Sequence, residues 1–296
     1  MRTAYLGTSS FAAAVLERLA ASAHRPQLVI TRPDRPRGRG RRLQPPPVAQ
    51  AARALGLELE QPESVNSEEA RARIVAAAPD AVCVCAFGAL IKEPLLSEHL
   101  LLNVHPSLLP RWRGAAPIER AIMAGDERTG VSIMRVTAGL DSGPVYLAQA
   151  EPIGSEDTYG TLSARLERLG GELLVRALDD LPPASEQDES EATYAQKITG
   201  EDRRLDPSRS ATELERVVRA LAPHIGAWVE LDGGTRLGVS EARALPYEAG
   251  PAGSLVVGAS GTPALACARG ELQLLRVKPA GRKEMSGPEW LRGYKP

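Results

Sequence analysis

An asparagine and a histidine stand two positions apart at the end of an apolar run. In the stretch LLNVHP, Asn103 and His105 are followed at once by Pro106. Residues i and i+2 of a β-strand point to the same face, and the proline ends the strand because it has no donor for the ladder. Such a pair can move a proton through the imidazole and stabilise an oxyanion through the amide. It equally fits a plain strand exit whose side chains cap backbone groups, so it does not define a reaction by itself.

A carboxylate follows the next strand-like run. The run VSIMRV leads into the glycine-rich loop TAGLDSGP, residues 137–144, which contains Asp141. Because the exits of strands that are neighbours in sequence are usually neighbours in space, we expect Asp141 to face His105. A carboxylate in that place orients an imidazole and raises its pKa, whereas the alternative is a simple turn aspartate. No serine or cysteine stands in an obvious nucleophile position, so the attacking group is expected to come from a substrate.

A third stretch is strongly basic. TRPDRPRGRGRR, residues 31–42, holds six arginines and one acidic residue. Proline and glycine interrupt it too often for a helix, so we predict a loop that follows the second strand. A loop of this charge beside the ligand-binding edge of a sheet favours contact with phosphates, and hence with nucleic acid. A solvated surface loop is the alternative.

The first half of the chain alternates short apolar runs with helical patterns. Runs such as TAYLG, QLVIT, DAVCVCAFG and LLLNVH are separated by stretches such as FAAAVLERLA and PVAQAARALGL. This order predicts an α/β domain with a doubly wound, mostly parallel, Rossmann-like sheet. Ligands of such sheets bind beyond the carboxyl ends of the strands, where Asn103 and His105 are expected. The turn GTSSF lacks the dinucleotide fingerprint GxGxxG and is expected to cap the first helix through Ser9 or Ser10.

The second half changes character after residue 185. We predict a catalytic domain over residues 1–185, a polar linker over 186–206 and a smaller C-terminal domain over 207–296. The last of these begins with the amphipathic pattern ATELERVVRAL and continues with short alternating runs between glycines and prolines, which is typical of a small β-barrel. Residues 192–296 carry 15 Lys and Arg against 12 Asp and Glu, so this part is slightly basic.

The overall composition excludes several classes of protein. The net charge is −1 and 43% of the residues are hydrophobic, which is ordinary for a globular protein and gives no global basic field. We expect Cys83, Cys85 and Cys267 in the core, because Cys-x-Cys lacks the CxxC spacing of metal and redox sites. Neither a signal peptide nor an apolar run of membrane-spanning length is evident, so we expect a cytoplasmic protein.

Longer strings of the sequence resemble a known family. NVHPSLLPRWRGAAPIERAI followed by GLDSGP is similar to the signature of the 10-formyltetrahydrofolate-dependent formyltransferases. The arginine-rich stretch and the segments YAQKI and PAGRKEM narrow the resemblance to the methionyl-tRNA formyltransferases, over nearly the whole chain. The resemblance implies that a formyl group passes from 10-formyltetrahydrofolate to the α-amine of methionine on initiator methionyl-tRNA, without a metal. It also implies an OB-like C-terminal domain that binds tRNA, and a monomer.

The resemblance assigns roles to individual residues. It implies that Asn103, His105 and Asp141 are catalytic, with the first two stabilising an oxyanion and Asp141 orienting His105 and accepting a proton from the amine. The implied folate contacts are Phe87, Gly88, Ala89, Leu90, Ile91, Ser107, Leu108, Leu109, Pro110, Gly139 and Leu140. The implied tRNA contacts are Arg35, Arg37, Arg39, Arg41 and Arg42, with Arg39 at the acceptor end.

Three other functions share part of this pattern. A formyltransferase for a nucleotide-linked amino sugar would use the same Asn, His and Asp but would not need the arginine-rich loop. A hydrolase that releases formate from the same folate would not need a tRNA-binding domain. A tRNA-binding or folate-binding protein with an inactive site would have lost one of the three polar residues, and all three are present. The sequence therefore favours the tRNA-directed transferase.

Overall fold

The computed structural model describes residues 1–37, 40, 42–231, 234–247, 250–258 and 261–294. The chain divides into two compact units. Unit 1 comprises Met1–Gly114, Thr129–Glu151 and Ser163–Tyr194, and unit 2 comprises Ala115–Arg128, Pro152–Leu162 and Ala195–Pro296. Each unit therefore combines segments that are far apart in the sequence. The stretch 186–206, predicted as a linker, contributes its first part to unit 1 and the remainder to unit 2.

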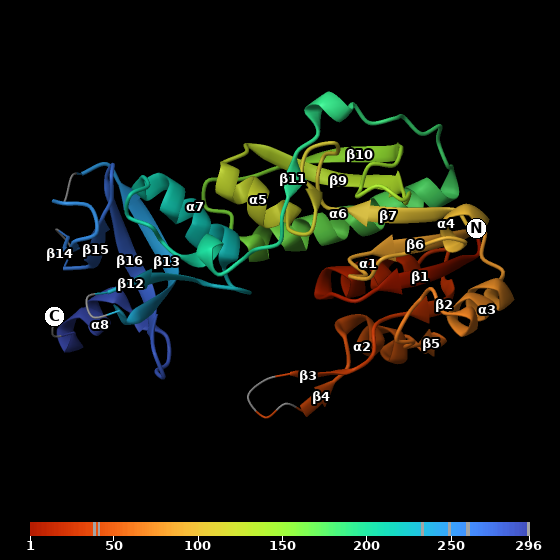
Figure 1. Cartoon of the computed structure of the whole chain (residues 1–296), viewed down its shortest axis with the longest axis horizontal. Coiled ribbons are helices and arrows are strands. Elements are labelled where there is room, and N and C mark those ends of the chain that lie inside the picture. Colours follow the sequence, from red (N-terminus) through yellow and green to blue (C-terminus); the bar gives the residue numbers. More distant parts are fainter. Residues whose placement is uncertain (38–39, 41, 232–233, 248–249, 259–260, 295–296) are drawn as a thin grey trace. The chain divides into compact units, whose positions relative to one another are not determined.

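Unit 1 is built around a seven-stranded sheet with the order β10-β9-β7-β6-β1-β2-β5 (Figure 1). The strands are β1 (Thr3–Gly7), β2 (Pro26–Ile30), β5 (Leu59–Glu60), β6 (Ala81–Cys85), β7 (Leu101–His105), β9 (Arg128–Arg135) and β10 (Val145–Pro152). The pairs β1–β2, β2–β5, β1–β6 and β6–β7 are parallel, and β9 is antiparallel to β7. The predicted mostly parallel, doubly wound sheet is confirmed.

Helices connect these strands, and local signals in the sequence explain where they begin. They are α1 (Ser10–Ala20), α2 (Pro47–Ala54), α3 (Glu68–Ala77), α4 (Leu95–Glu98) and α6 (Tyr159–Asp179). Of the two candidate caps for α1, Ser9 is the one used, because its hydroxyl accepts a hydrogen bond from the Ala12 N–H. Helix α2 begins at Pro47, which needs no backbone donor in the first turn.

The central strands form the core of unit 1. Every residue of β1 and β6 is buried, as their continuous apolar runs predict. Cys83 and Cys85 are free and fully buried, and their burial raises the pKa of each thiol to about 12. Cys267, in unit 2, is also free and buried. The prediction that the three cysteines are core residues is confirmed.

The direction of the chain reverses between β1 and β6. The chain starts in β1, moves outward through β2 and β5, and then returns to β6 on the other side of β1. The loops that follow β1 and β6 meet there, where the Thr8 hydroxyl donates to the Phe87 carbonyl over 2.7 Å. In open α/β sheets this switch point is where ligands bind.

Unit 2 contains an antiparallel sheet with the order β12-β13-β16-β15-β14, and β17 pairs with β16. Its strands are β12 (Ala227–Glu230), β13 (Arg236–Leu245), β14 (Leu255–Val257), β15 (Pro263–Ala266), β16 (Glu271–Pro279) and β17 (Met285–Ser286), and its helices are α5 (Pro117–Ala124), α7 (Ala211–Leu221) and α8 (Gly287–Gly293). The predicted smaller β domain after the parallel sheet is confirmed as an antiparallel sheet domain, and its closure into an OB-like barrel stays a prediction.

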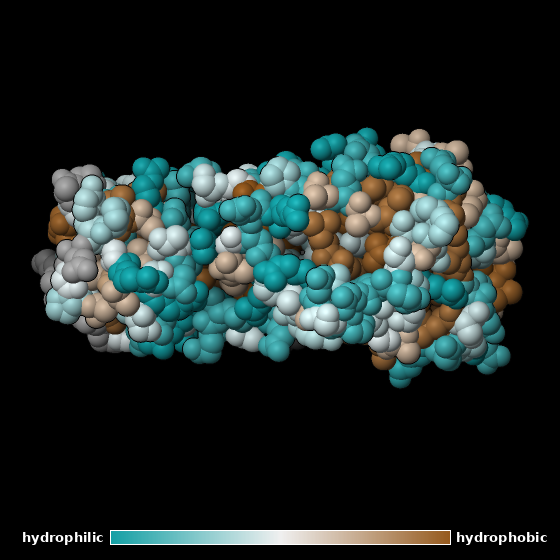
Figure 2. All heavy atoms as spheres, turned by 90° about the horizontal axis from the view of Figure 1, so that it is seen from above, coloured by the Kyte–Doolittle hydropathy of each residue, from teal (hydrophilic) through white to brown (hydrophobic). Residues whose placement is uncertain are grey.

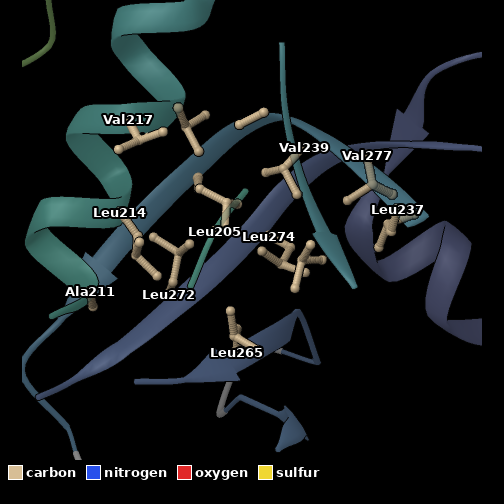
Figure 3. Close-up of a cluster of buried hydrophobic side chains, with 14 of the residues drawn as sticks. Leu205, Ala211, Leu214, Val217, Leu237, Val239, Leu265, Leu272, Leu274 and Val277 are labelled. Atoms are coloured by element: carbon tan, nitrogen blue, oxygen red, sulfur yellow. The ribbon is translucent and has the colours of Figure 1, made fainter. Parts of the chain in front are cut away.

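Helix α7 closes one side of this sheet. Ser210 and Glu213 form a reciprocal capping box at its start. Its apolar stripe, which includes Leu214 and Val217, packs on side chains of β13 and β16 such as Leu272 and Val239 (Figure 3). The helix is therefore held by its cap and by the hydrophobic core of unit 2.

Short elements complete the chain. The basic stretch forms a hairpin of β3 (Arg35–Arg37) and β4 (Arg42–Gln44), in which Arg35 pairs with Gln44. β8 (Arg113–Gly114) and β11 (Tyr194–Ala195) form another two-stranded sheet, and η1 (Glu189–Glu191) and η2 (Glu201–Arg203) are single 3₁₀ turns. The sequence predicts a loop here; in the residues that the structure describes the stretch contains no helix, as expected, but forms two short paired strands.

Hydrophobic side chains gather on one face over unit 1, drawn in brown in Figure 2. This face includes β10, whose residues 145–147 are half-buried because the strand ends the sheet.

Among the helices that the structure describes, none combines the length and the apolar character needed to cross a bilayer.

An ion pair within unit 2 joins α5 to the turn η2. The Arg120 guanidinium donates to both carboxylate oxygens of Asp202, over 2.7 and 3.1 Å, and the Thr199 N–H and hydroxyl donate to the same carboxylate. The hydrogen bond from Arg120 is the main cause that lowers the pKa of Asp202 to about 2. A carboxyl with a depressed pKa stabilises the folded state above its unfolded pKa of about 4, and that stabilisation is lost as the pH falls toward 2.

We expect Asp202→Asn to lower the free energy of unfolding of unit 2 by about 1 to 2 kcal/mol at pH 7 and to have little further effect near pH 2. Urea unfolding at a series of pH values measures this. Tryptophan fluorescence follows the unfolding. In a Trp112→Phe background the remaining tryptophans, Trp228 and Trp290, both lie in unit 2, so the signal comes from that unit. Glu201→Gln, at an exposed acid beside Asp202, is the control, and an equal loss of stability in both variants would contradict the assignment.

Candidate active site

The end of β7 places Asn103 and His105 at the carboxyl edge of the parallel strands. The strand ends at His105, as the following proline predicts. β7 lies between β6 and β9, so both residues are in the interior of the sheet. Asn103 is half-buried and His105 is 4% exposed. The two side chains are therefore held by the sheet rather than by a loop.

The ring of His105 has a defined orientation. Its Nε2 lies 2.9 Å from the Trp112 carbonyl oxygen. Because a carbonyl only accepts hydrogen bonds, Nε2 carries a hydrogen and donates it. The other ring nitrogen, Nδ1, faces Asp141 with Oδ2 at 3.7 Å. That distance suits a charge interaction but exceeds a hydrogen bond, so Nδ1 is available to a substrate atom.

Asp141 contacts both residues of β7. Its Oδ1 accepts from Asn103 Nδ2 over 3.5 Å, at the long limit of a hydrogen bond, and its Oδ2 faces His105. The Gly114 N–H donates to Oδ2 over 2.8 Å and fixes the position of the carboxylate. The structure thus brings the three predicted catalytic side chains together, with Asn103 and His105 next to the carboxylate of Asp141.

Asp141 reaches His105 by a route that the sequence did not suggest. β9 runs antiparallel to β7, so that His105 pairs with Ser132 and Leu102 pairs with Arg135. The end of β9 therefore lies beside the start of β7, and the loop after it must turn back. Asp141 makes part of this turn with a left-handed backbone at φ 46°. Asp141 lies close to His105, as predicted. The reason given for that prediction is wrong, because β7 and β9 are antiparallel and their ends lie at opposite edges of the pair.

A group of residues that the sequence did not indicate supports the Asp141 loop. The Gln187 side chain donates to the carbonyls of Asp141 and Gly143, and its Oε1 accepts from Arg113. Arg113 is 1% exposed and also pairs with Glu189. That hydrogen bond to Arg113 lowers the pKa of the Glu189 carboxyl. In the sequence, Gln187 and Glu189 stand out only as members of a polar, charged stretch, and linkers have the same composition.

The segments predicted to contact folate surround the switch point. Phe87 and Ile91 are buried, whereas Leu90 is 68% exposed. The side chain of Arg32 donates to the Gly88 carbonyl over 2.7 Å and holds the segment beside β2. In the Asp141 loop Leu140 is 61% exposed. An exposed leucine in each of these two predicted folate segments offers apolar surface for an aromatic ligand.

The remaining predicted folate contacts occupy the turn after β7 and the loop after β9. Ser107 is fully buried, and its hydroxyl donates to the Arg111 carbonyl, so it shapes the turn. The other predicted residues in these segments are half-buried or exposed, namely Leu108, Leu109, Pro110 and Gly139.

The hairpin of β3 and β4 carries the predicted tRNA contacts. Arg35 is exposed and pairs with Glu63 over 3.0 Å, and Arg42 is exposed. The backbone of Arg37 lies in β3, while Arg39 and Arg41 lie outside the described residues. At the base of the hairpin the Gln61 amide donates to the Asp34 carboxylate and to the Arg32 carbonyl, which fastens the hairpin to the sheet.

Within the described ranges, no group of three or more His, Cys, Asp or Glu side chains is arranged to hold a metal ion. The site consists of an amide, an imidazole and a carboxylate, with one backbone donor at Gly114 and one backbone acceptor at Trp112. This set can stabilise an oxyanion and accept a proton from an attacking group.

Comparison with known families and proteins gives full-length matches. A family model described as Formyl transferase matches residues 1–178, and one described as Formyl transferase, C-terminal domain, matches residues 197–295. The methionyl-tRNA formyltransferase of Halorhodospira halophila is 44% identical over 302 residues, covering 99% of this chain and 96% of that protein. The methionyl-tRNA formyltransferase of Methylococcus capsulatus is 43% identical over 301 residues, with coverages of 99% and 97%.

Solved structures share the fold at low identity. HypX from Aquifex aeolicus, in complex with tetrahydrofolic acid, has a TM-score of 0.67 at 17% identity and covers 98% of this chain and 47% of that one. An N-formyltransferase from Helicobacter canadensis, in complex with folinic acid and dTDP-3-aminofucose, has a TM-score of 0.67 at 12% identity, with coverages of 93% and 99%.

The geometry around His105 predicts its tautomer. At a pH where the ring is neutral, we expect the hydrogen to reside on Nε2, because that atom donates to the Trp112 carbonyl. A long-range ¹H–¹⁵N spectrum distinguishes the two nitrogens, and the signals that disappear in His105→Gln assign the ring. A hydrogen on Nδ1 in the neutral form would contradict this orientation.

Proposed function

The chain belongs to the family of methionyl-tRNA formyltransferases, and on that premise we propose that Asn103, His105 and Asp141 perform the transfer. The chain moves a formyl group from 10-formyltetrahydrofolate to the α-amine of methionine on initiator methionyl-tRNA, which serves translation initiation. Relatives over the whole length act on methionyl-tRNA by name, so transfer to an amino sugar and hydrolysis of the folate are not favoured.

The observation that carries the proposal is the contact of one carboxylate with both an amide and an imidazole. Asp141 lies 3.5 Å from Asn103 Nδ2 and 3.7 Å from His105 Nδ1. Neither distance commits the donors fully to Asp141, so both can also reach a substrate oxygen. A reacting carbonyl requires hydrogen-bond donors that lie close together and are not fully used by bonds to each other.

The first step forms a bond between the amine nitrogen and the formyl carbon. The electron pair of the formyl C=O moves onto oxygen and gives a tetrahedral oxyanion. Asn103 Nδ2–H and protonated His105 Nδ1–H donate to that oxygen, which lowers the barrier because both donors are already in place. Nε2 keeps its hydrogen bond to the Trp112 carbonyl throughout, so the ring does not need to turn.

The second step moves a proton and breaks a bond. The amine nitrogen becomes positively charged when it attacks, and Asp141 accepts one of its protons, directly or through a water molecule. The bond between the formyl carbon and N10 of the folate then breaks, and N10 needs a proton as it leaves. The proton that Asp141 accepted balances that requirement, so the site returns to its starting state.

The folate is held beside the triad by the segment after β6. We assign its ring system to residues 87–91 and the Asp141 loop, where exposed leucines stand next to backbone polar groups. The tRNA is assigned to the β3–β4 hairpin and to unit 2, with the predicted OB-like domain binding its backbone. Exposed arginines on the hairpin and the basic excess of the C-terminal region support this assignment. A monomer that works in the cytoplasm, where tRNA is used, completes the proposal.

We expect His105→Gln and Asp141→Asn each to lower kcat for methionyl-tRNA by about 100-fold or more, because each removes a group that acts in the transition state. Formyl transfer to methionyl-tRNA, to a UDP-linked amino sugar and without an acceptor measures this in parallel. Circular dichroism checks that both variants are folded. Near-normal kcat in a folded variant would remove that residue from the mechanism, and product on the sugar or free formate would change the acceptor instead.

Loss of charge on the hairpin should weaken tRNA binding and leave the chemistry intact. We expect the double variant Arg35→Ala, Arg42→Ala to raise KM for tRNA about 10-fold at moderate salt. The slope of log Kd against log salt concentration should fall by about one to two, because about one to two phosphate contacts are lost. KM for the folate should not change.

The control removes two exposed arginines of α6, by Arg168→Ala with Arg176→Ala. It makes the same change in net charge away from the hairpin. Equal losses in the two double variants would show that only total charge matters, and would remove the hairpin from the tRNA site.

A further inference from the structure

The loop that carries Asp141 has a strained and tightly packed backbone. Asp141 itself has a left-handed backbone, which costs a non-glycine residue roughly 1 kcal/mol or more. A Cβ atom at Gly143 would overlap the Arg135 carbonyl oxygen, and one at Gly139 would overlap the Ser142 hydroxyl. The loop is therefore folded tightly on itself, with carbonyl groups that need donors from elsewhere.

One side chain supplies those donors. Gln187 Nε2 donates to the Asp141 carbonyl over 2.9 Å and to the Gly143 carbonyl over 2.7 Å. These two carbonyls flank the turn at Ser142, so the amide bridges it. Both hydrogens of the amide are thereby used within the protein.

The orientation of this amide is fixed from the other side. Gln187 Oε1 accepts from Arg113 Nε over 3.0 Å and from Arg113 Nη2 over 2.9 Å. A guanidinium only donates, so the amide cannot flip without placing its NH₂ group against the two N–H donors of Arg113 that now bond its oxygen. Glu189 holds the guanidinium through two further bonds of 2.8 Å.

The two peptide groups that flank the Cα of Arg113 contact the catalytic residues directly. The carbonyl before it, of Trp112, accepts from His105 Nε2, and the N–H after it, of Gly114, donates to Asp141 Oδ2. Arg113 is thus linked to the Asp141 loop in two ways: its side chain through Gln187, and its backbone through the N–H of the next residue, Gly114. A shift of this arginine would displace the contacts of both catalytic residues.

Gln187 and Glu189, which hold the Arg113 guanidinium, belong to one segment, residues 185–194, which we call the strap. At one end Ser185 exchanges two backbone hydrogen bonds with Val145, which follows the Asp141 loop. At the other end the Thr193 hydroxyl accepts from the Trp112 N–H, and the Thr193 carbonyl accepts from the Arg113 N–H. Gln187 lies between these anchors.

We propose that Gln187 is a positioning residue for formyl transfer, which holds the Asp141 loop in its reactive geometry through the two carbonyls that it bridges. The proposal rests on the role of Asp141 in the proposed function. Because all hydrogen-bonding capacity of the Gln187 amide is used inside the protein, it acts through Asp141 and not on the substrate. Displacement of a catalytic group by about 1 Å is enough to cost about 100-fold in rate.

Two substitutions separate the functions of the amide. Gln187→Met keeps the length of the side chain but removes its donors and its acceptor. Gln187→Glu keeps the acceptor for Arg113 and loses the donors to Asp141 and Gly143. We expect both to lower kcat by about 10-fold to 100-fold, with KM for folate and for tRNA changed less than about 3-fold. Full activity in Gln187→Glu would overturn the proposal, because the contact with Arg113 would then suffice.

A double-mutant cycle distinguishes positioning from a general loss of structure. We expect Gln187→Met to cause no further loss when it is added to Asp141→Asn, because the residue that it positions is already inactive. Single-turnover assays with excess enzyme keep the residual rates measurable. Multiplied losses would show an independent structural effect and overturn the proposal.

Control measurements keep the outcomes distinct. Ser190→Ala alters the strap at an exposed hydroxyl that donates to the Asp188 carboxylate over 2.7 Å, and it should leave kcat unchanged. Thermal unfolding checks the fold of Gln187→Met, and Gln187→Glu provides the test if the first variant is unfolded. If Asp141→Asn is fully active, the proposed function fails; if it is inactive while both Gln187 variants are active, only the role of Gln187 fails.

Discussion

A guanidinium that has no access to water is the constraint on which the candidate site depends. Arg113 is 1% exposed, and arginine does not lose its charge at any ordinary pH, so its burial requires partners for every donor. Glu189 provides the opposite charge and Gln187 provides a neutral acceptor. Both partners lie in the strap, so unit 1 can bury this charge only when the strap is in place. The same constraint then orders the peptide groups beside Arg113, which contact the catalytic residues.

Each catalytic side chain divides its polar atoms between the protein and the substrate. His105 commits Nε2 to a backbone carbonyl and leaves Nδ1 toward the reaction. Asp141 takes a short hydrogen bond from the Gly114 N–H and only longer approaches from Asn103 and His105. This arrangement fixes the groups before the substrate binds, which is the usual origin of electrostatic stabilisation in enzymes. The sheet supplies two of the three residues, and a strained loop supplies the third.

The sequence predicted those parts of the structure that depend on local signals. The run LLNVHP specified a strand and its end, because alternation and proline act on neighbouring residues. The direction of β9 was not predictable, since parallel and antiparallel strands share the same alternation of side chains, and Asp141 was therefore expected near His105 for an incorrect reason. Gln187 was missed because its partner Asp141 lies 46 positions away and its segment is as polar as a linker. Long-range hydrogen bonds of this kind leave no periodicity to detect.

The position of the strap in the chain has a consequence for the order in which the enzyme is made. Every strand of the parallel sheet is complete by residue 105, yet Arg113 finds its charge partner 76 positions further on. Contacts at that sequence separation close slowly, because the intervening chain must first be ordered. A nascent chain that has emerged only as far as β10 therefore has the sheet and all three catalytic residues. It does not yet have the strap, whose Gln187 holds the Asp141 loop in position. The contacts that hold the Asp141 loop are thus completed by the last part of unit 1 to leave the ribosome.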